Sequence, residues 1–300
     1  MNLKGIFPPL TTPFASDGSI AISCLRENIA RYNRLRLAGY VVNGSTSESV
    51  LLTWEEVYRV WEAAKEAAAP GRTMIAGTGA ESTLETIEHT QRAAALGYDA
   101  ALVRTPSFYK PAMNDDTLAS HYLRVADAAR IPILVYSVPV FTHVTVEASL
   151  IARIASHPNI IGMKDSSGNV EGVVKIMAAA PKSFTLLVGS ASTVYESLAR
   201  GAGGAILALA NPFPEICITI GEASQSGDSA TANLLQKKLL PAAKILGPQY
   251  GISGLKYAMD RLGYFGGPPR PPLLPVNDSA RREIDALLAS IVPAPAFARP

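Results

Sequence analysis

One lysine in this sequence closes an apolar run. Lys164 follows the run Ile160–Met163, whereas the other lysines stand in helix-like or loop stretches. Burial in such a place removes water from the ammonium group, which lowers its pKa and leaves more of the neutral amine. A neutral amine can attack a ketone and form a Schiff base. The alternative is a structural lysine that extends to solvent or pairs with Asp165.

Other polar groups also follow apolar runs. Tyr136 ends the preceding run, and a phenol beside an imine-forming lysine can shuttle protons; the alternative is an interior aromatic with one hydrogen bond. Ser45 and Thr46 follow Gly44 and suit a small carboxylate, although a plain helix N-cap has the same pattern. Arg104 ends another run. We expect it to face the helix layer or a subunit contact. The alternative is that it faces the pocket and supplies a cation for the distal end of the substrate, since strand direction is not fixed by sequence.

Two other chemistries find little support. The segment Gly77–Ser82 is similar to a dinucleotide fingerprint, but Ser82 takes the place of the third glycine and no acidic residue closes the next run near residue 100. The four histidines lack metal-binding spacing, and His89 and His121 are expected on helix surfaces. We therefore expect neither a nicotinamide site nor a metal site.

The elements that position these groups repeat along the chain. Eight short, nearly continuous apolar runs alternate with helix-like stretches, which is typical of parallel strands buried on both faces. The expected strands are residues 5–10, 40–43, 74–77, 100–103, 133–136, 160–164, 186–189 and 205–209. Eight such units predict a closed (β/α)8 barrel, in which catalytic groups stand at the carboxyl ends of the strands. An open doubly wound sheet is the structural alternative.

Helix signals flank these runs. Thr53–Ala69 and Ser82–Leu96 each begin with a capping box, formed by Thr53 with Glu56 and by Ser82 with Glu85. Weaker helices are expected over residues 149–156 and 170–179. After the eighth run, helices are expected over residues 214–246, 251–262 and 279–288, with an extended turn at 266–272 and a frayed end at 292–300. We assign residues 1–222 to the barrel with the active site and 223–300 to a C-terminal helical extension.

Composition excludes several classes of protein. The chain has 300 residues, of which 48% are hydrophobic, and a formal net charge of +2, so it is neither disordered nor built as a nucleic-acid clamp. No apolar run approaches the ~18 residues of a membrane span. Residues 1–5 lack an export signal, and Cys24 and Cys217 are expected as reduced core residues. We therefore expect a cytoplasmic protein that binds neither nucleic acid nor membrane.

Motifs along the whole chain resemble the dihydrodipicolinate synthase / N-acetylneuraminate lyase superfamily. They are Gly44-Ser45-Thr46-x-Glu48, Thr105-Pro106, Tyr136-Ser137-Val138-Pro139, and Gly162-Met163-Lys164-Asp165-Ser166-Ser167-Gly168. The likeness runs from Pro8 to Pro268. Within the superfamily, segments 136–139, 157–166 and 208–211 are most similar to 4-hydroxy-2-oxoglutarate aldolase.

The resemblance implies a role for each matching residue. Lys164 would form the Schiff base with a 2-oxo acid, and Tyr136 would shuttle protons. Ser45 and Thr46 would hold the 2-oxo acid carboxylate, and the strand around Ile206 would line the pocket. The resemblance also implies a homotetramer built as a dimer of dimers, with no cofactor beyond the covalent imine on Lys164.

The sequence departs from the family pattern at substrate-contacting positions. The family's relay tyrosine, which reaches across the dimer contact, is replaced by Phe108, and phenylalanine cannot relay a proton; Tyr109 stands beside it. The synthase arginine for a distal carboxylate is replaced by Phe141, which removes a charge-assisted contact and argues against dihydrodipicolinate synthesis. Ser190-Ala191-Ser192 replaces the acidic pair that binds the sialic acid polyol.

The predicted function is that of a class I lyase or aldolase acting on a 2-oxo acid. The favoured reaction cleaves a 4-hydroxy-2-oxo acid to pyruvate and an aldehyde. One alternative is a dehydratase of 2-oxo-3-deoxy sugar acids, and dihydrodipicolinate synthase is a less favoured one. A weakly active 2-oxo-acid-binding regulatory protein is an alternative of another class, with Phe108 as its main support.

Overall fold

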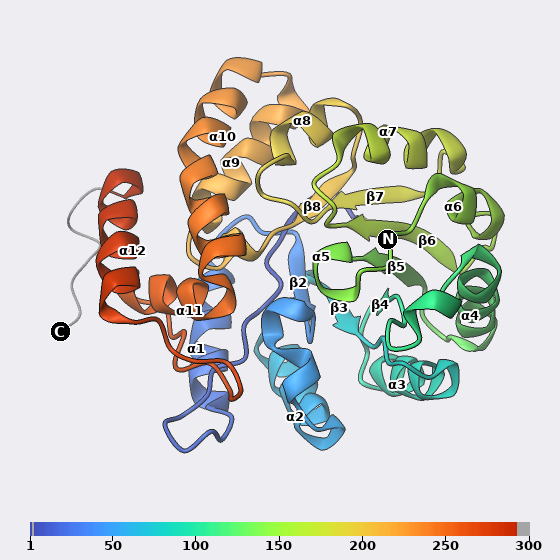
Figure 1. Cartoon of the computed structure of the whole chain (residues 1–300), viewed down its shortest axis with the longest axis horizontal. Coiled ribbons are helices and arrows are strands. Elements are labelled where there is room, and N and C mark those ends of the chain that lie inside the picture. Colours follow the sequence, from blue (N-terminus) through green and yellow to red (C-terminus); the bar gives the residue numbers. More distant parts are fainter. Residues whose placement is uncertain (2, 293–300) are drawn as a thin grey trace.

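Eight parallel strands form one sheet in the computed structural model, which describes residues 1 and 3–292 (Figure 1). Their order is β1-β8-β7-β6-β5-β4-β3-β2. The strands are β1 (Gly5–Phe7), β2 (Gly39–Val42), β3 (Thr73–Gly77), β4 (Ala100–Arg104), β5 (Ile133–Ser137), β6 (Ile160–Asp165), β7 (Thr185–Val188) and β8 (Gly204–Ile206). The eight strands expected from the apolar runs are confirmed, with small shifts at their ends.

The two strands at the ends of this order also meet. Pro9 and Val41 form a parallel bridge, and the Leu10 N–H donates to the Val41 carbonyl oxygen at 2.8 Å. The sheet therefore closes on itself, as the (β/α)8 prediction requires. The open doubly wound alternative is wrong.

Helices surround the strands and follow them in the chain (Figure 1). Around the barrel they are α1 (Ile22–Tyr32), α2 (Trp54–Ala67), α3 (Thr83–Ala95), α4 (Asp115–Ala128), α5 (Pro139–Thr142), α6 (Ala148–Ile154), α7 (Val170–Ala179), α8 (Val194–Ala199) and α9 (Pro214–Ser226). The capping box of α2 is confirmed. In α3, Ser82 caps the helix as expected, but the Glu85 carboxylate accepts a hydrogen bond from Trp54 Nε1 instead.

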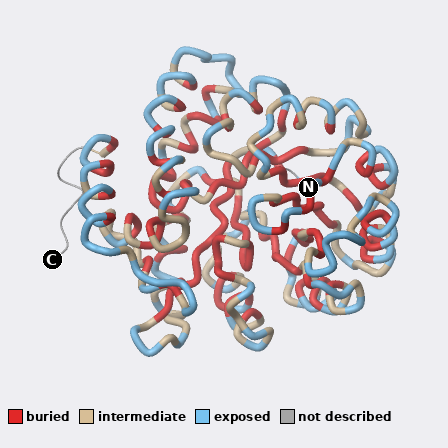
Figure 2. The backbone as a smooth tube through the Cα atoms, in the orientation of Figure 1, coloured by how far each residue is buried: buried red, intermediate tan, exposed pale blue. Residues whose placement is uncertain are grey.

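Side chains alternate between two apolar clusters along each strand. Inside the barrel, Leu102, Leu134 and Ile206 belong to a small cluster, whereas Val103 and Val135 belong to the large cluster between strands and helices. This period of two follows from the pleat of a strand. Figure 2 shows the buried backbone concentrated in the strands and on the inner sides of the helices. The residues at the strand ends therefore point either into the barrel mouth or under the helices.

The C-terminal part of the chain adds three helices beyond α9. They are α10 (Ser229–Lys244), α11 (Gly251–Arg261) and α12 (Asp278–Ile291). The single helical stretch expected over 214–246 is divided at Gly227, whose φ of 80° ends α9 in the left-handed region. The proposed boundary between residues 222 and 223 lies within α9 and stays a prediction. Of the segment expected to fray, residues 293–300 lie outside the described residues.

A buried ion pair joins this extension to the barrel. Lys256 of α11 is 0% exposed, and its Nζ donates to Glu48 Oε1 at 2.6 Å. The same ammonium group donates to the carbonyl oxygens of Thr12 and Pro268. Glu48 Oε2 accepts a hydrogen bond from the Arg270 N–H at 2.7 Å. Both charges are therefore fully hydrogen-bonded, which is the condition under which a buried pair is tolerated.

Replacing Lys256 by Met leaves the Glu48 carboxylate buried without its cation. We expect the free energy of unfolding to fall by about 3–5 kcal/mol, measured by denaturant titration. The double variant Lys256→Met/Glu48→Gln should recover part of this loss because no lone charge remains. Breaking the exposed Arg36–Glu222 pair by Arg36→Met is the control, expected to change stability by less than about 1 kcal/mol. Equal losses in the two single variants would contradict the role given to the buried pair.

Candidate active site

Three polar residues occupy one row across neighbouring strands. Arg104 of β4 is the register partner of Tyr136 of β5, and Tyr136 is the register partner of Lys164 of β6. Adjacent strands lie about 4.8 Å apart, so the backbones of Arg104 and Lys164 are on the order of 10 Å from each other. The row stands at the carboxyl ends of the strands, where (β/α)8 enzymes carry their catalytic groups.

An irregularity in β6 directs Lys164 into the barrel. The β5–β6 register moves from Ile133↔Ile160 to Leu134↔Gly162, so Ile161 is an extra residue. Ile160 and Met163 both pack in the outer cluster, although strict alternation would place them on opposite faces. One extra residue in a strand moves every side chain after it to the opposite face of the sheet. Lys164 consequently points inward with only 3% of its surface exposed.

The Lys164 amine lies against the face of Tyr136, with Nζ 4.1 Å from the ring centroid. The Tyr136 hydroxyl is in turn 3.2 Å from Ser45 Oγ. Asp165, the alternative partner of Lys164, instead accepts a hydrogen bond from Ser167 Oγ at 2.6 Å. Burial raises the pKa of Asp165, and the bonds from Ser167 oppose that rise. The alternative in which Lys164 forms an ion pair with Asp165 is therefore wrong.

The remaining residues expected at the site take different positions. Ser45 and Thr46 lie in a short 3-10 turn, Ser45–Ser47, that follows β2. Ser45 contacts Tyr136, and Thr46 is buried at 7% exposure. Ile206 is fully buried in the inner barrel cluster at the end of β8. The structure thus brings Lys164, Tyr136 and Ser45 into one contact chain, with Ile206 in the barrel interior.

Ser45 and Tyr136 of this contact chain line a cavity of about 280 Å³, whereas Lys164 is not among the residues that line it. Its walls come from the ends of β2, β3, β4 and β5 and from the turns that follow them. The lining residues are Asn43, Gly44, Ser45, Ser49, Val50, Leu52, Trp54, Gly77, Gly79, Ala80, Glu81, Glu85, Leu102, Arg104 and Tyr136. The segment similar to a dinucleotide fingerprint, 77–82, therefore supplies part of the wall of this cavity.

Arg104 faces the cavity and not the helix layer, so that part of the expectation is wrong; the alternative of a subunit contact stays a prediction. Ala100 and Leu102 belong to the inner cluster of the barrel, and Arg104 continues their parity on β4. Its side chain passes directly over Gly79, where an added Cβ would lie 2.8 Å from Arg104 Cγ. Arg104 Nη1 then reaches Glu81 Oε1 at 2.7 Å. The glycine is needed there because any side chain would collide with the arginine.

The two phenylalanines that replace family polar residues lie at the surface of the single chain. Phe108 is 78% exposed and contacts Tyr109 edge to face, with ring centroids 5.1 Å apart. Phe141 of α5 is 64% exposed. Neither ring is among the residues that line the cavity. Their roles in substrate binding stay predictions.

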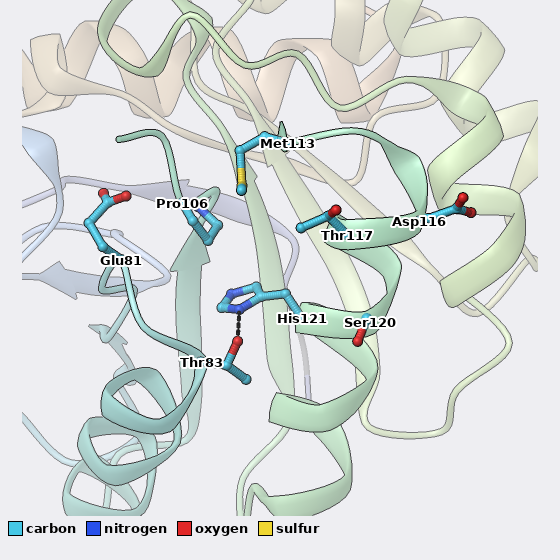
Figure 3. Close-up of a pocket in the computed structure, with 8 residues that line it drawn as sticks. All are labelled: Glu81, Thr83, Pro106, Met113, Asp116, Thr117, Ser120 and His121. Carbon is cyan, nitrogen blue, oxygen red and sulfur yellow. Dashed lines mark hydrogen bonds between the residues drawn. The ribbon is translucent and has the colours of Figure 1, made fainter. Parts of the chain in front are cut away.

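Both helix histidines are buried, contrary to the expectation of surface positions. His89 stacks on Trp54 and bonds to the Tyr58 hydroxyl, and burial lowers its pKa. His121 bonds through Nδ1 to Thr83 Oγ1 at 2.9 Å, and burial lowers its pKa to about 4 (Figure 3). The reason is packing of α2, α3 and α4 against one another, which covers these faces.

A second cavity of about 450 Å³ lies outside the barrel between α3 and α4. Figure 3 shows His121 and Thr83 on its lower side and Glu81, Pro106 and Met113 around it. Glu81 lines both cavities. This carboxylate therefore forms part of the wall between them.

Two features are absent from residues 1 and 3–292. These residues contain no group of three or more His, Cys, Asp or Glu side chains arranged to hold a metal ion. They also contain no helix that is long and apolar enough to cross a membrane.

Comparison with known proteins places this geometry in a family. The model of the dihydrodipicolinate synthetase family matches residues 2–291. A 4-hydroxy-tetrahydrodipicolinate synthase of Rhizobium meliloti is 36% identical, over 95% of this chain and 97% of its own length. The corresponding protein of Exiguobacterium sibiricum is 34% identical, over 94% of this chain and 95% of its own length.

Solved structures agree with these matches. Dihydrodipicolinate synthase from Aquifex aeolicus superposes with a TM-score of 0.91 at 30% identity, covering 96% of this chain and 97% of its own. The chloride-inhibited dihydrodipicolinate synthase from Acinetobacter baumannii, solved with pyruvate, has a TM-score of 0.93 at 29% identity and covers 97% and 100%. The chain belongs to the dihydrodipicolinate synthetase family and is a pyruvate-dependent, Schiff-base-forming lyase of the aldolase type.

Proposed function

We propose that this enzyme cleaves a 4-hydroxy-2-oxo acid to pyruvate and an aldehyde through an imine on Lys164. The contact chain from Lys164 to Tyr136 to Ser45 carries the proposal. It supplies a nucleophile, a proton carrier and a hydroxyl in the order that this reaction needs.

The chemistry follows from that order. Lys164 Nζ attacks the C2 carbonyl, water is lost, and a protonated imine forms. Tyr136 gives its phenolic proton to the hydroxyl that leaves as water when the imine forms, and the resulting phenolate takes the proton of the C4 hydroxyl. The C3–C4 bond then breaks, and its electron pair moves into the imine to give an enamine. The aldehyde leaves, C3 is reprotonated, and water hydrolyses the imine to release pyruvate. The protonated imine is the electron sink, so the proposed route uses no metal or organic cofactor.

Ser45 and Thr46 are proposed to hold the carboxylate of the 2-oxo acid. Ser45 Oγ already contacts the Tyr136 hydroxyl at 3.2 Å, so a carboxylate bound there lies next to the proton carrier. The apolar side chain of Ile206, fully buried at the opposite strand β8, is proposed to bound the same space.

The names of the relatives favour a second candidate, formation of 4-hydroxy-tetrahydrodipicolinate. Against it stands Phe141, an exposed apolar ring where the resemblance expects a cation for a distal carboxylate. Incubation with the substrates of that synthase, followed by detection of its product, separates the two candidates.

We also propose a homotetramer built as a dimer of dimers. Large hydrophobic side chains are exposed, each between 64% and 78%, in the loop after β4 and in α5 after β5: Phe108, Tyr109, Val140 and Phe141. Exposed aromatic side chains in such number favour a protein–protein contact. In this assembly Phe108 approaches the proton relay of a neighbouring copy.

Borohydride reduction in the presence of pyruvate should fix the imine as a stable amine on Lys164. Peptide mass spectrometry then identifies the modified lysine. Lys256 is an internal control, because it is equally buried but its ammonium group already donates three hydrogen bonds. Modification elsewhere, or none at all, would remove the basis of the proposed reaction.

Replacing Tyr136 by Phe keeps the ring under Lys164 but removes the hydroxyl that carries the proton. We expect the exchange of the pyruvate methyl hydrogens with deuterated water, followed by NMR, to slow by about 10²–10⁴-fold. Tyr195→Phe, on the outer helix α8, should exchange at the parent rate. An unchanged rate in Tyr136→Phe would assign the proton transfer to another group.

Phe108→Tyr restores a hydroxyl at the relay position. We expect faster aldol cleavage, by about 10-fold or more if proton transfer limits turnover, measured as pyruvate release. Light scattering should give the same tetrameric mass for parent and variant, so that a change in assembly does not explain the rate. No acceleration in an intact tetramer would mean that the missing hydroxyl does not limit the reaction.

A further inference from the structure

Arg104 stands in the same row as Tyr136 and Lys164, but nothing in the reaction above uses it. It is 21% exposed at its side chain and lines the cavity with Ser45 and Tyr136. Within residues 1 and 3–292, Arg104 is the one basic residue that lines this cavity. Its backbone lies two strands from Lys164, on the order of 10 Å away, which is within the length of a short substrate bound at the lysine.

Glu81 fixes one edge of the guanidinium group. Its Oε1 accepts from Arg104 Nη1, and its Oε2 accepts from the Ser107 N–H at 2.8 Å and the Phe108 N–H at 2.9 Å. Burial raises the pKa of Glu81, but these hydrogen bonds outweigh it and hold the pKa below its usual value. The carboxylate is therefore ionised at neutral pH, and the arginine is held in place rather than free to swing into solvent.

Part of the guanidinium group remains available to a ligand. Nη1 bonds to Glu81 and to the Thr105 carbonyl oxygen, while Nε and Nη2 have no hydrogen-bond partner among the described residues. Glu85, held by Trp54 Nε1, adds a second carboxylate to the same cavity. This wall therefore presents one cation beside two anions.

Such a wall discriminates between ligand groups by charge. A carboxylate of the substrate is attracted by Arg104 but repelled by Glu81 and Glu85. A hydroxyl group is uncharged, accepts a hydrogen bond from a guanidinium and donates one to a carboxylate. The 2.7 Å bond between Arg104 Nη1 and Glu81 Oε1 places the remaining guanidinium N–H groups beside the carboxylate. A hydroxyl can accept from the first and donate to the second, which neither a carboxylate nor an alkyl group can do.

We propose that Arg104, fixed by Glu81, determines specificity for the aldehyde half of the substrate and selects an uncharged, hydroxylated group there. The proposal rests on the imine chemistry of Lys164, because that chemistry places the aldehyde half beyond Tyr136. It identifies the substrate class as 2-oxo acids that carry a further hydroxyl past the bond that is cleaved.

The test uses the full-length enzyme in its native assembly and measures the aldol condensation of pyruvate with an aldehyde. Pyruvate is offered with three aldehydes that differ at the far end: glyceraldehyde, the apolar propionaldehyde, and the anionic glyoxylate. The parent enzyme should show its highest kcat/KM with glyceraldehyde. Arg104→Met, which keeps an unbranched stem, should lower kcat/KM for glyceraldehyde by about 10- to 100-fold and for propionaldehyde by less than about 3-fold. Arg104→Lys keeps the positive charge but loses the planar guanidinium with its several N–H donors. Its kcat/KM for glyceraldehyde should therefore lie between those of the parent enzyme and Arg104→Met.

Two further variants sharpen the comparison. Glu81→Gln removes the repulsive charge and keeps an acceptor oxygen, so the ratio of glyoxylate to glyceraldehyde turnover should rise. Arg200→Met is the matched control, because that arginine pairs with Glu171 and Glu196 on the outer helices. It should leave all three aldehydes unchanged.

The outcomes separate this proposal from the one it rests on. Pyruvate methyl exchange requires Lys164 but no aldehyde, so it reports the imine chemistry alone, and it should proceed at the parent rate in Arg200→Met. If Arg104→Met lowered kcat/KM equally for all three aldehydes, Arg104 would have only a structural role, and its proposed role in specificity would be overturned. A parent enzyme that prefers glyoxylate or propionaldehyde would overturn the hydroxylated substrate class, even where methyl exchange proceeds normally.

Discussion

The ion pair between Lys256 and Glu48 is the interaction that joins the C-terminal extension, the barrel and the site. Glu48 follows the turn Ser45–Ser47 directly and adopts a left-handed φ of 58°. Its two carboxylate oxygens are held by Lys256 and by the backbone of Arg270, both from the C-terminal extension. Two opposite charges at 0% and 1% exposure remain in the interior only while each has its partner. The turn that presents Ser45 to Tyr136 therefore depends on residues more than 200 positions away.

The rest of the extension supports the same contact. Lys256 Nζ lies 4.4 Å from the centroid of the Phe14 ring, and the Arg270 guanidinium carbon lies 4.4 Å from the same centroid. Arg270 also binds Glu56, in the first turn of α2, through both carboxylate oxygens. The C-terminal extension thus stabilises the turn after β2 through Lys256 and Arg270. This explains how a short, irregular turn holds a defined geometry without a strand or a long helix of its own.

The candidate residues on the strands are positioned in a different way. Arg104, Tyr136 and Lys164 come from adjacent strands whose backbone hydrogen bonds set their spacing. Rigid strands position such groups more accurately than loops do. The net charge of the chain is only +2, so binding of a small anion depends on local groups around this row rather than on the field of the whole protein. The exposed segments that carry Phe108 and Phe141 lie after β4 and β5, at the same ends of the strands as this row.

Local sequence determined the eight strands, the cap at Thr53, and the place of Lys164 at the end of a buried run, because apolar periodicity, caps and a polar residue after an apolar run are all local signals. Three features depended on tertiary structure. Lys164 faces inward because the bulge in β6 moves the side chains that follow it to the opposite face. Arg104 faces inward because β4 has no such bulge and its alternation continues from Leu102. The sequence of one strand alone does not reveal its register with its neighbours. His89 and His121 are buried because helices pack around them. Lys256, which reads as an ordinary helix lysine, meets Glu48 across 208 residues only after the barrel and the extension have come together.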